Sequence, residues 1–174
     1  CTTCDPGTFQ GTAAQTKCES CAAGKASVAG QSVCLPCKPG ERLDGSTCIQ
    51  CEAGTYSPLG AVTCTECENG RYQDAKAQAA CIACGAGTYG NQAGQKAEKD
   101  FPNSGDGCKN CGNGKYSSAQ GAVVESQCNS CSPGKYSAQL AQISANSCIN
   151  CMIGKYGDTD GATTISACKN CTVG

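Results

Sequence analysis

Twenty cysteines offer most of the chemistry in this chain, and they fall into ten C-x-x-C pairs. Cysteine pairs at this spacing bind zinc, act as a redox centre or form structural disulfides. The 10 to 23 residues between pairs suit zinc sites made of four cysteines. Against zinc, the chain has no His, and the Gly-x-Tyr feature described below has no role at a zinc site. A redox centre needs one reactive pair at a helix N-terminus, whereas these ten pairs are equivalent. The pattern therefore favours disulfides.

Other catalytic groups are scarce. Without His, the Ser/His/Asp and Cys/His arrangements of nucleophilic enzymes cannot form within this chain. Asp158-Thr159-Asp160-Gly161 resembles the start of a calcium loop, yet it lacks the later Glu and is read as a turn. We predict that the protein is not an enzyme and uses no metal or cofactor.

The composition points to crosslinks as the source of stability. Leu, Ile, Val and Phe together make up only 18 of 174 residues, too few for one continuous hydrophobic core. A high and even cysteine count is typical of disulfide scaffolds in oxidising compartments, so we expect an extracellular or cell-surface location. The net charge of −1 argues against binding of nucleic acid, and no apolar run is long enough for insertion into a membrane.

The cysteine pairs are part of a repeat that runs through residues 1–174. A glycine stands three residues after the second cysteine of each pair, and an aromatic residue follows two positions later in seven of nine cases. The exceptions are Ala26 and Arg42. The repeat, C-x-x-C-x-x-G-x-[Y/F], starts at residues 1, 18, 34, 48, 64, 81, 108, 128, 148 and 168. We predict one continuous array of about ten repeats, a fragment of a longer chain that extends beyond both ends.

Each repeat predicts a small turn-and-strand unit. The glycine indicates a positive φ in a tight turn, and a proline precedes it in three repeats. The following aromatic residue can begin a short strand and cover a neighbouring disulfide. The predicted fold class is therefore small disulfide-rich repeats, an elongated rod or solenoid of short β-hairpin and turn units with little helix. In such an array each unit contacts mainly its neighbours.

The residues leave two disulfide schemes open. The repeat-preserving scheme joins the second cysteine of each pair to the first of the next, and Cys1 and Cys171 then pair with units outside this sequence. A rival scheme joins first to third and second to fourth cysteines, as in 1–18 and 4–21. The first scheme, which we favour, gives these pairs: Cys4–Cys18, Cys21–Cys34, Cys37–Cys48, Cys51–Cys64, Cys67–Cys81, Cys84–Cys108, Cys111–Cys128, Cys131–Cys148 and Cys151–Cys168.

At CEAGTYS (51–57) and CSPGKYS (131–137), the repeat resembles the ephrin-receptor-like (GCC2/GCC3) cysteine-rich repeats, and more distantly the modules of tumour-necrosis-factor receptors. The resemblance implies the same disulfide-rich fold and supports the sequential pairing. It implies no particular function, because such repeats occur in receptors, adhesion proteins and large surface proteins.

We predict an extracellular structural protein, a disulfide-laddered segment of a stalk, filament or surface coat that can assemble into fibres. The alternative is a ligand-binding or adhesion ectodomain of a cell-surface receptor, with contacts at exposed tyrosines and near Phe101 in the insertion at 96–106. Expected partners are copies of the chain itself or other extracellular proteins. Asn170-Cys171-Thr172 fits the N-glycosylation pattern, which makes Asn170 a candidate glycan site.

Overall fold

The computed structural model describes residues 3–12, 16–97 and 107–172. In these residues the chain forms nine two-stranded hairpin sheets from strands that are consecutive in the sequence, and each hairpin carries a disulfide. Hairpin 1 is made of β1 and β2, and the numbering continues to hairpin 9, made of β17 and β18. The predicted class of small disulfide-rich hairpin units is confirmed.

Most strands are only two residues long, because each repeat supplies one short extended segment on either side of its loop. The first strand follows the repeat glycine, and the second consists of the two residues inside the next C-x-x-C, except in hairpin 3, where both strands have four residues. The bounds are β1 Thr8–Phe9, β2 Glu19–Ser20, β3 Lys25–Ala26, β4 Leu35–Pro36, β5 Glu41–Asp44, β6 Thr47–Gln50, β7 Thr55–Tyr56, β8 Thr65–Glu66, β9 Arg71–Tyr72, β10 Ile82–Ala83, β11 Thr88–Tyr89, β12 Lys109–Asn110, β13 Lys115–Tyr116, β14 Asn129–Ser130, β15 Lys135–Tyr136, β16 Ile149–Asn150, β17 Lys155–Tyr156 and β18 Lys169–Asn170.

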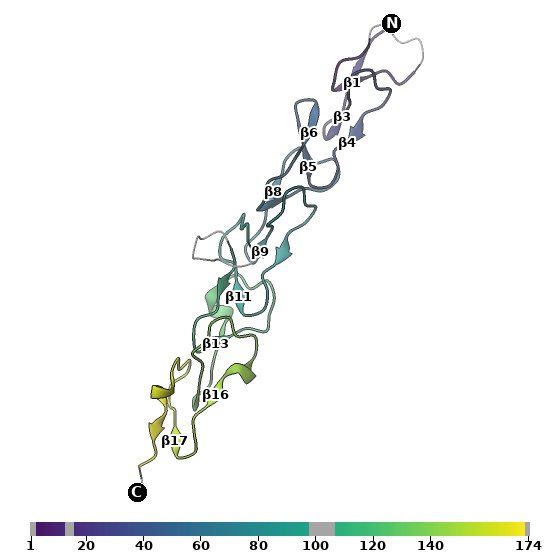
Figure 1. Cartoon of the computed structure of the whole chain (residues 1–174). Coiled ribbons are helices and arrows are strands. Elements are labelled where there is room, and N and C mark those ends of the chain that lie inside the picture. Colours follow the sequence, from purple (N-terminus) through teal and green to yellow (C-terminus); the bar gives the residue numbers. More distant parts are fainter. Residues whose placement is uncertain (1–2, 13–15, 98–106, 173–174) are drawn as a thin grey trace. The chain divides into compact units, whose positions relative to one another are not determined.

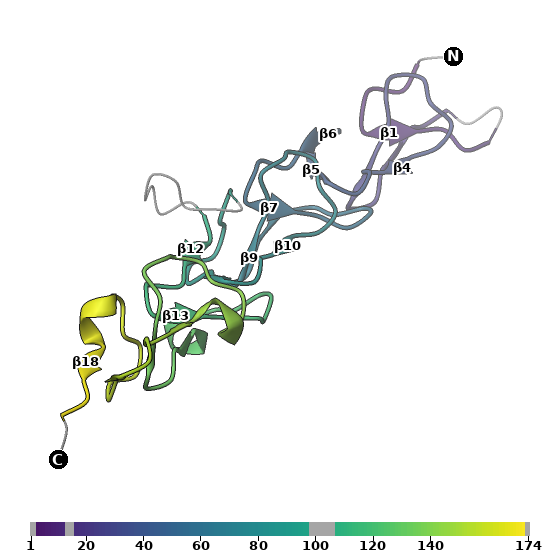
Figure 2. The same ribbon diagram turned by 60° about the horizontal axis from the view of Figure 1, so that its bottom comes forward.

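The helical content of the described residues is confined to three single turns of 3₁₀ helix. These are η1 (Glu125–Gln127), η2 (Ala145–Ser147) and η3 (Ile165–Ala167). Each lies in the loop of one of hairpins 7 to 9 and ends at the cysteine that closes that loop. Figure 2 shows them as short coils in the green to yellow part of the ribbon.

The chain divides into two compact units. Unit 1 comprises Cys1–Cys67 and Gln73–Ile82, and unit 2 comprises Glu68–Tyr72 and Ala83–Gly174. Hairpins 1 to 4 belong to unit 1 and hairpins 6 to 9 to unit 2, while hairpin 5 contributes residues to both. Within each unit the labelled strands follow one another in chain order (Figure 1).

A tight turn opens every hairpin, and we call the repeat glycine within it the turn glycine. In the nine hairpins φ of this residue lies between +73° and +84°. The N–H of the next residue donates to the carbonyl two residues before the turn glycine, as from Lys135 to Ser132 at 3.1 Å. A positive φ at the third position is the signature of a type II turn, which accepts proline at the second position, where Pro6, Pro39 and Pro133 stand. The predicted turn is confirmed.

The same backbone bond closes each hairpin. The N–H of the second cysteine in a C-x-x-C donates to the carbonyl of the preceding turn glycine in all nine hairpins, at 2.8–3.0 Å. This bond extends the ladder of a two-residue strand by one step. Short strands therefore form wherever the cysteine pair and the turn glycine keep their register.

Disulfides take the place of a hydrophobic core. Most cysteines are buried, and the buried apolar set of the described residues otherwise holds only Tyr72 and Ala122. Tyr72 is 7% exposed and clusters with Cys84 and Cys108, so its ring covers the disulfide of the following hairpin. This is the packing that the repeat predicts for its aromatic residue.

Candidate functional site

The eighteen cysteines assigned to internal pairs lie in nine disulfides that follow the sequential scheme. Their Cα–Cα separations are 5.4–5.8 Å. The bonds are Cys4–Cys18, Cys21–Cys34, Cys37–Cys48, Cys51–Cys64, Cys67–Cys81, Cys84–Cys108, Cys111–Cys128, Cys131–Cys148 and Cys151–Cys168. The first-to-third scheme has no counterpart among the described residues.

The candidate functional site is a junction between hairpins that recurs along each unit. Its centre is a linking residue, which stands three positions after the turn glycine. Ser117 accepts a hydrogen bond from the turn glycine of hairpin 6 (Gly87, 2.8 Å) and donates its own N–H to Gln142 of hairpin 8 (2.9 Å). Ser57, Gly90 and Ser137 make the corresponding pair of bonds. One residue thus connects three successive hairpins through its backbone.

Serine side chains complete these junctions. Ser27 and Ser57 are buried, and each donates its hydroxyl to a backbone carbonyl in the previous hairpin, Ser27 to Thr8 (2.8 Å) and Ser57 to Glu41 (2.9 Å). A buried hydroxyl without a partner would be costly, so these bonds allow a polar residue in the interior.

A second set of positive-φ residues forms the other half of the junction. We call them the loop residues: Gly30, Gly60, Ala77, Gly94, Gly121, Ala141 and Gly161. Six of them donate their N–H to the carbonyl of the cysteine that begins the disulfide of the preceding hairpin. Gly161, for example, donates to Cys131 of the Cys131–Cys148 disulfide at 2.8 Å. The sequence analysis did not detect this set. A glycine six or seven positions after most turn glycines was the available signal.

The carbonyl of a loop residue reaches two hairpins back. It lies against the bare Cα of a turn glycine, where an added Cβ would overlap it. This occurs at Gly24 beneath Gly60, Gly40 beneath Ala77, Gly70 beneath Gly121, Gly87 beneath Ala141 and Gly114 beneath Gly161. The expectation that repeats contact mainly their immediate neighbours is therefore incomplete, because next-nearest hairpins also touch. Glycine is required by close approach as well as by φ.

The aromatic strand also takes part in the junction of unit 2. Tyr72, Tyr89, Tyr116 and Tyr136 each form a parallel bridge with the residue after the loop residue of the following hairpin, as Tyr136 does with Ala162. Burial, with the nearby Glu125 carboxylate adding to it, raises the pKa of Tyr89. Among the described tyrosines only Tyr156 is exposed, at 47%. Most tyrosines therefore pack within the unit rather than present a free surface.

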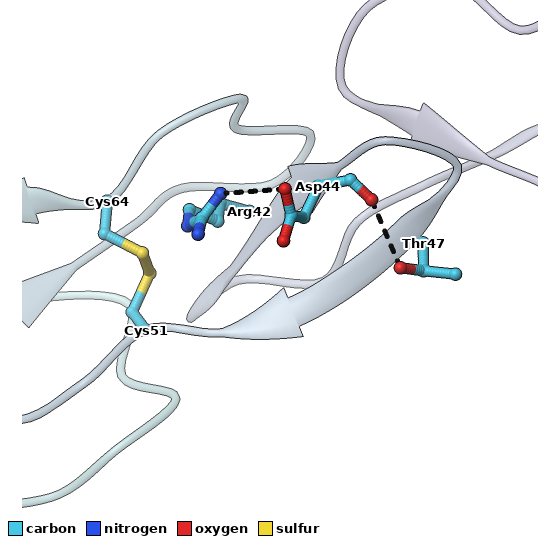
Figure 3. Close-up of polar contacts among 5 residues, drawn as sticks. All are labelled: Arg42, Asp44, Thr47, Cys51 and Cys64. Carbon is cyan, nitrogen blue, oxygen red and sulfur yellow. Dashed lines mark hydrogen bonds and ion pairs between the residues drawn. A yellow bond between two sulfur atoms is a disulfide. The ribbon is translucent and has the colours of Figure 1, made fainter.

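The two repeats without an aromatic residue differ from each other. In hairpin 3 the position holds Arg42, whose guanidinium lies 3.7 Å from the Asp44 carboxylate. Figure 3 draws this pair together with the Cys51–Cys64 disulfide of hairpin 4. In hairpin 2 the position holds Ala26, which is too small to reach the next disulfide. Ala26 lines a pocket of about 460 Å³ within unit 1.

Ion pairs account for the acidic turn near the C-terminal end. Lys169 donates to Asp158 at 2.7 Å, and the hydroxyl of Thr159 donates to the same carboxylate. The Lys169 bond first, and the Thr159 bond second, hold the pKa of Asp158 below its ordinary value. Within the described ranges no group of three or more His, Cys, Asp or Glu is arranged to hold a metal. The Asp158 carboxylate is thus paired with Lys169, and Asp160 and Gly161 lie in a turn.

The remaining predicted positions lie at the ends of the chain. Cys171 is exposed and has no disulfide partner among the described residues, so its pairing with an outside unit remains a prediction. Cys1 lies outside the described residues. Asn170 is exposed in β18, opposite Lys155, and its glycosylation remains a prediction.

The enlarged repeat is described only at its base. Ala97 and Gly107 form a bridge there, while Phe101 and the rest of 98–106 lie outside the described residues. The buried side chain of Gln95 donates to the Gly107 carbonyl and occupies the space beside Gly90. Gly90 is the linking residue of its hairpin and stands where Ser57, Ser117 and Ser137 stand in theirs.

Comparison with known proteins places part of the chain in a recognised group. Residues 54–100 match the family described as tyrosine-protein kinase ephrin type A/B receptor-like. No curated protein matches the chain. The segment 54–100 is thus an ephrin-receptor-like cysteine-rich domain, as the resemblance implied.

The match and the disulfides together indicate an extracellular cysteine-rich segment. Cysteine-rich modules of this family are typically non-catalytic. No helix of the described residues is long and apolar enough to cross a bilayer.

Proposed function

We propose that the chain is a load-bearing structural segment of an extracellular protein, within a stalk, filament or surface coat. The observation that carries this proposal is the order of covalent bonds along the chain. Each disulfide bypasses the 10 to 23 residues between its two cysteines, and only the two residues inside a C-x-x-C separate one disulfide from the next. Tension applied to the chain ends would follow the crosslinks and leave the loops unloaded.

The geometry gives this path a short maximum length. A disulfide spans about 5.7 Å between Cα atoms, and a C-x-x-C segment adds about 10 Å when extended, so a repeat reaches about 16 Å. A reduced repeat of about 19 residues reaches about 63 Å at the same extension per residue. The oxidised segment is therefore about fourfold less extensible than the free chain.

Single-molecule force spectroscopy on the full chain, held by its two ends, tests this proposal. We expect the oxidised chain to stop extending at about a quarter of the length reached after complete reduction. A chain that extends equally far in both states would refute a load path through the crosslinks. Iodoacetamide labelling before and after reduction provides the matched control for the number of disulfides.

A ligand-binding or adhesion ectodomain is the second candidate function, and one observation favours it. The pocket beside Ala26 arises where the repeat pattern is broken, and it opens on a surface with exposed Val28 and Leu35. Loops that carry no load are free to vary for recognition.

A further inference from the structure

The pocket of unit 1 is formed by three successive hairpins. Pro6 comes from hairpin 1, Ala26, Val28 and Leu35 come from hairpin 2, and Thr47 and Cys48 come from hairpin 3. Its volume of about 460 Å³ lies in the range of ligand pockets. All of its lining residues belong to unit 1.

The register of the repeat identifies what would otherwise fill this space. In hairpin 5 the aromatic position holds Tyr72, whose ring covers the Cys84–Cys108 disulfide of hairpin 6. The equivalent position of hairpin 2 is Ala26, and the equivalent disulfide is Cys37–Cys48 of hairpin 3. Ala26 and Cys48 both line the pocket. The pocket therefore includes the place that an aromatic ring occupies elsewhere in the array.

A second departure from the pattern, in hairpin 3, supplies Ser46 and Thr47 to the lining of the pocket. Hairpin 3 has the shortest disulfide loop, with a separation of 11 residues, and its strands are joined by Gly45 and Ser46 alone. Ser46 lies against the turn glycine Gly7, where longer loops place a carbonyl. In hairpin 3 itself the aromatic position holds Arg42, whose guanidinium pairs with the Asp44 carboxylate.

The chemistry of the walls suits a phenol ring. Pro6, Val28 and Leu35 are apolar, while Gln31, Ser46 and Thr47 place polar groups in the lining. An apolar cavity of about 150 Å³ binds benzene, so this pocket admits a substituted ring together with part of its backbone. Aromatic rings also pack well against sulfur.

From this register we infer that the pocket binds a tyrosine side chain presented by a partner polypeptide. In hairpin 5 the Tyr72 ring reaches its disulfide from a polypeptide strand, so a peptide-borne ring can follow the same approach. The exposed side chains of Val28 and Leu35, at 64% and 58%, provide an apolar rim for the residues that flank the ring. This inference is independent of the load-bearing role.

Amide NMR on the full oxidised chain tests the inference with acetyl-Gly-Tyr-Gly-amide as the probe and acetyl-Gly-Leu-Gly-amide as its aliphatic control. We expect saturable shifts at Ala26, Val28, Leu35 and Thr47, with at least tenfold weaker binding of the Leu peptide. Ala26→Tyr should fill the pocket with the chain's own ring and reduce binding of the Tyr peptide at least tenfold. Ala79→Tyr, at an exposed alanine of the same unit, should leave binding unchanged.

Three results would overturn the inference. They are the absence of saturable shifts, shifts that persist in Ala26→Tyr, and binding of p-cresol without binding of the Tyr peptide. Mass spectrometry must show nine disulfides in each variant. If Ala26→Tyr does not form them, Leu35→Glu replaces it, since a charge on the apolar rim should weaken binding at least tenfold. Unchanged binding in that variant also refutes the proposal.

Discussion

Hairpins 1 to 3 and hairpins 7 to 9 use the same backbone scheme with different side chains. The disulfide separations of the first group are 14, 13 and 11 residues, whereas all three in the second group are 17. The second group repeats Lys-Tyr in its first strand and a 3₁₀ turn in its loop, while the first group keeps neither. Yet every hairpin of both groups has the type II turn and the closing bond from cysteine to turn glycine.

The comparison shows that main-chain geometry holds the repeat, while loop length and side-chain size decide what surface it presents. The longer loops place a carbonyl over the turn glycine two hairpins earlier, and the Tyr72 ring covers a disulfide. Where the loop is short and the ring is missing, the same scheme leaves a pocket. The surface pocket thus arises where a repeat lacks the loop length and the aromatic side chain that other repeats have.

Removing a crosslink should give the largest effect, and it should be similar in the two regions. Replacing both cysteines of Cys131–Cys148 or of Cys37–Cys48 by serine should cost about 3 kcal/mol of unfolding free energy, and loop-closure entropy makes the longer loop the costlier by about 0.4 kcal/mol. Hydrogen exchange should show a loss of protection that is largest in that hairpin and becomes smaller with each hairpin on either side. An equal loss of protection throughout the unit would show that the repeats are not locally stabilised.

Adding one methyl group at a turn glycine separates backbone strain from close packing. Gly114→Ala combines a positive φ with overlap against the Gly161 carbonyl and should cost about 3 kcal/mol. Gly7→Ala meets Ser46 Cβ at 2.7 Å, a smaller overlap than the one at Gly114, and should therefore cost about 2 kcal/mol.

Gly134→Ala is the matched control, because φ is +80° but no described atom lies within 4 Å of the added Cβ. It should cost about 1 kcal/mol from strain alone. Denaturant unfolding of the oxidised variants measures the order. Equal costs at all three positions would show that the close approach contributes nothing.

The smallest effect on unfolding free energy should come from exchanging alanine and glycine at the loop residues of hairpins 7 and 8. Ala141 has φ +56°, where the neighbouring repeats place Gly121 and Gly161. Ala141→Gly should stabilise by about 0.5 kcal/mol, because relief of strain exceeds the entropy that glycine gains in the unfolded chain. Gly121→Ala should destabilise by a similar amount, since its added Cβ meets only ordinary contacts.

Thermal unfolding of both variants checks the opposite signs. Ala145→Gly, in a 3₁₀ turn of the same loop, is the control and should destabilise by about 0.5 kcal/mol. Stabilisation by both glycine variants would mean that the positive φ of Ala141 is not the cause.

The sequence predicted the parts of this fold that depend on residue type. Cysteine pairs in fixed register indicate the crosslinks, and a glycine at a constant offset indicates a positive φ, as observed at Gly7 and Gly134. The aromatic position was predicted to cover a disulfide, and Tyr72 does so. These residues carry a chemical or conformational requirement that few others meet.

The junctions could not be predicted in the same way, because main-chain atoms make them. Any residue except proline supplies the N–H and carbonyl that Ser117 uses, so the serine that recurs at the linking position did not by itself indicate a junction. The loop position is obscured by its variable offset and by alanine at Ala77 and Ala141. The sequence marked Ala26 and Arg42 as departures from the aromatic pattern. Only the structure shows that Ala26 lines a pocket.

The main-chain character of the junctions has an evolutionary consequence. A duplicated repeat inserted in register would meet the same donors and acceptors on both sides, and a deleted repeat would leave flanking partners that still match. Repeats can therefore be gained or lost within the chain without a new interface having to evolve. The number of repeats, and with it the length of the protein, can change freely.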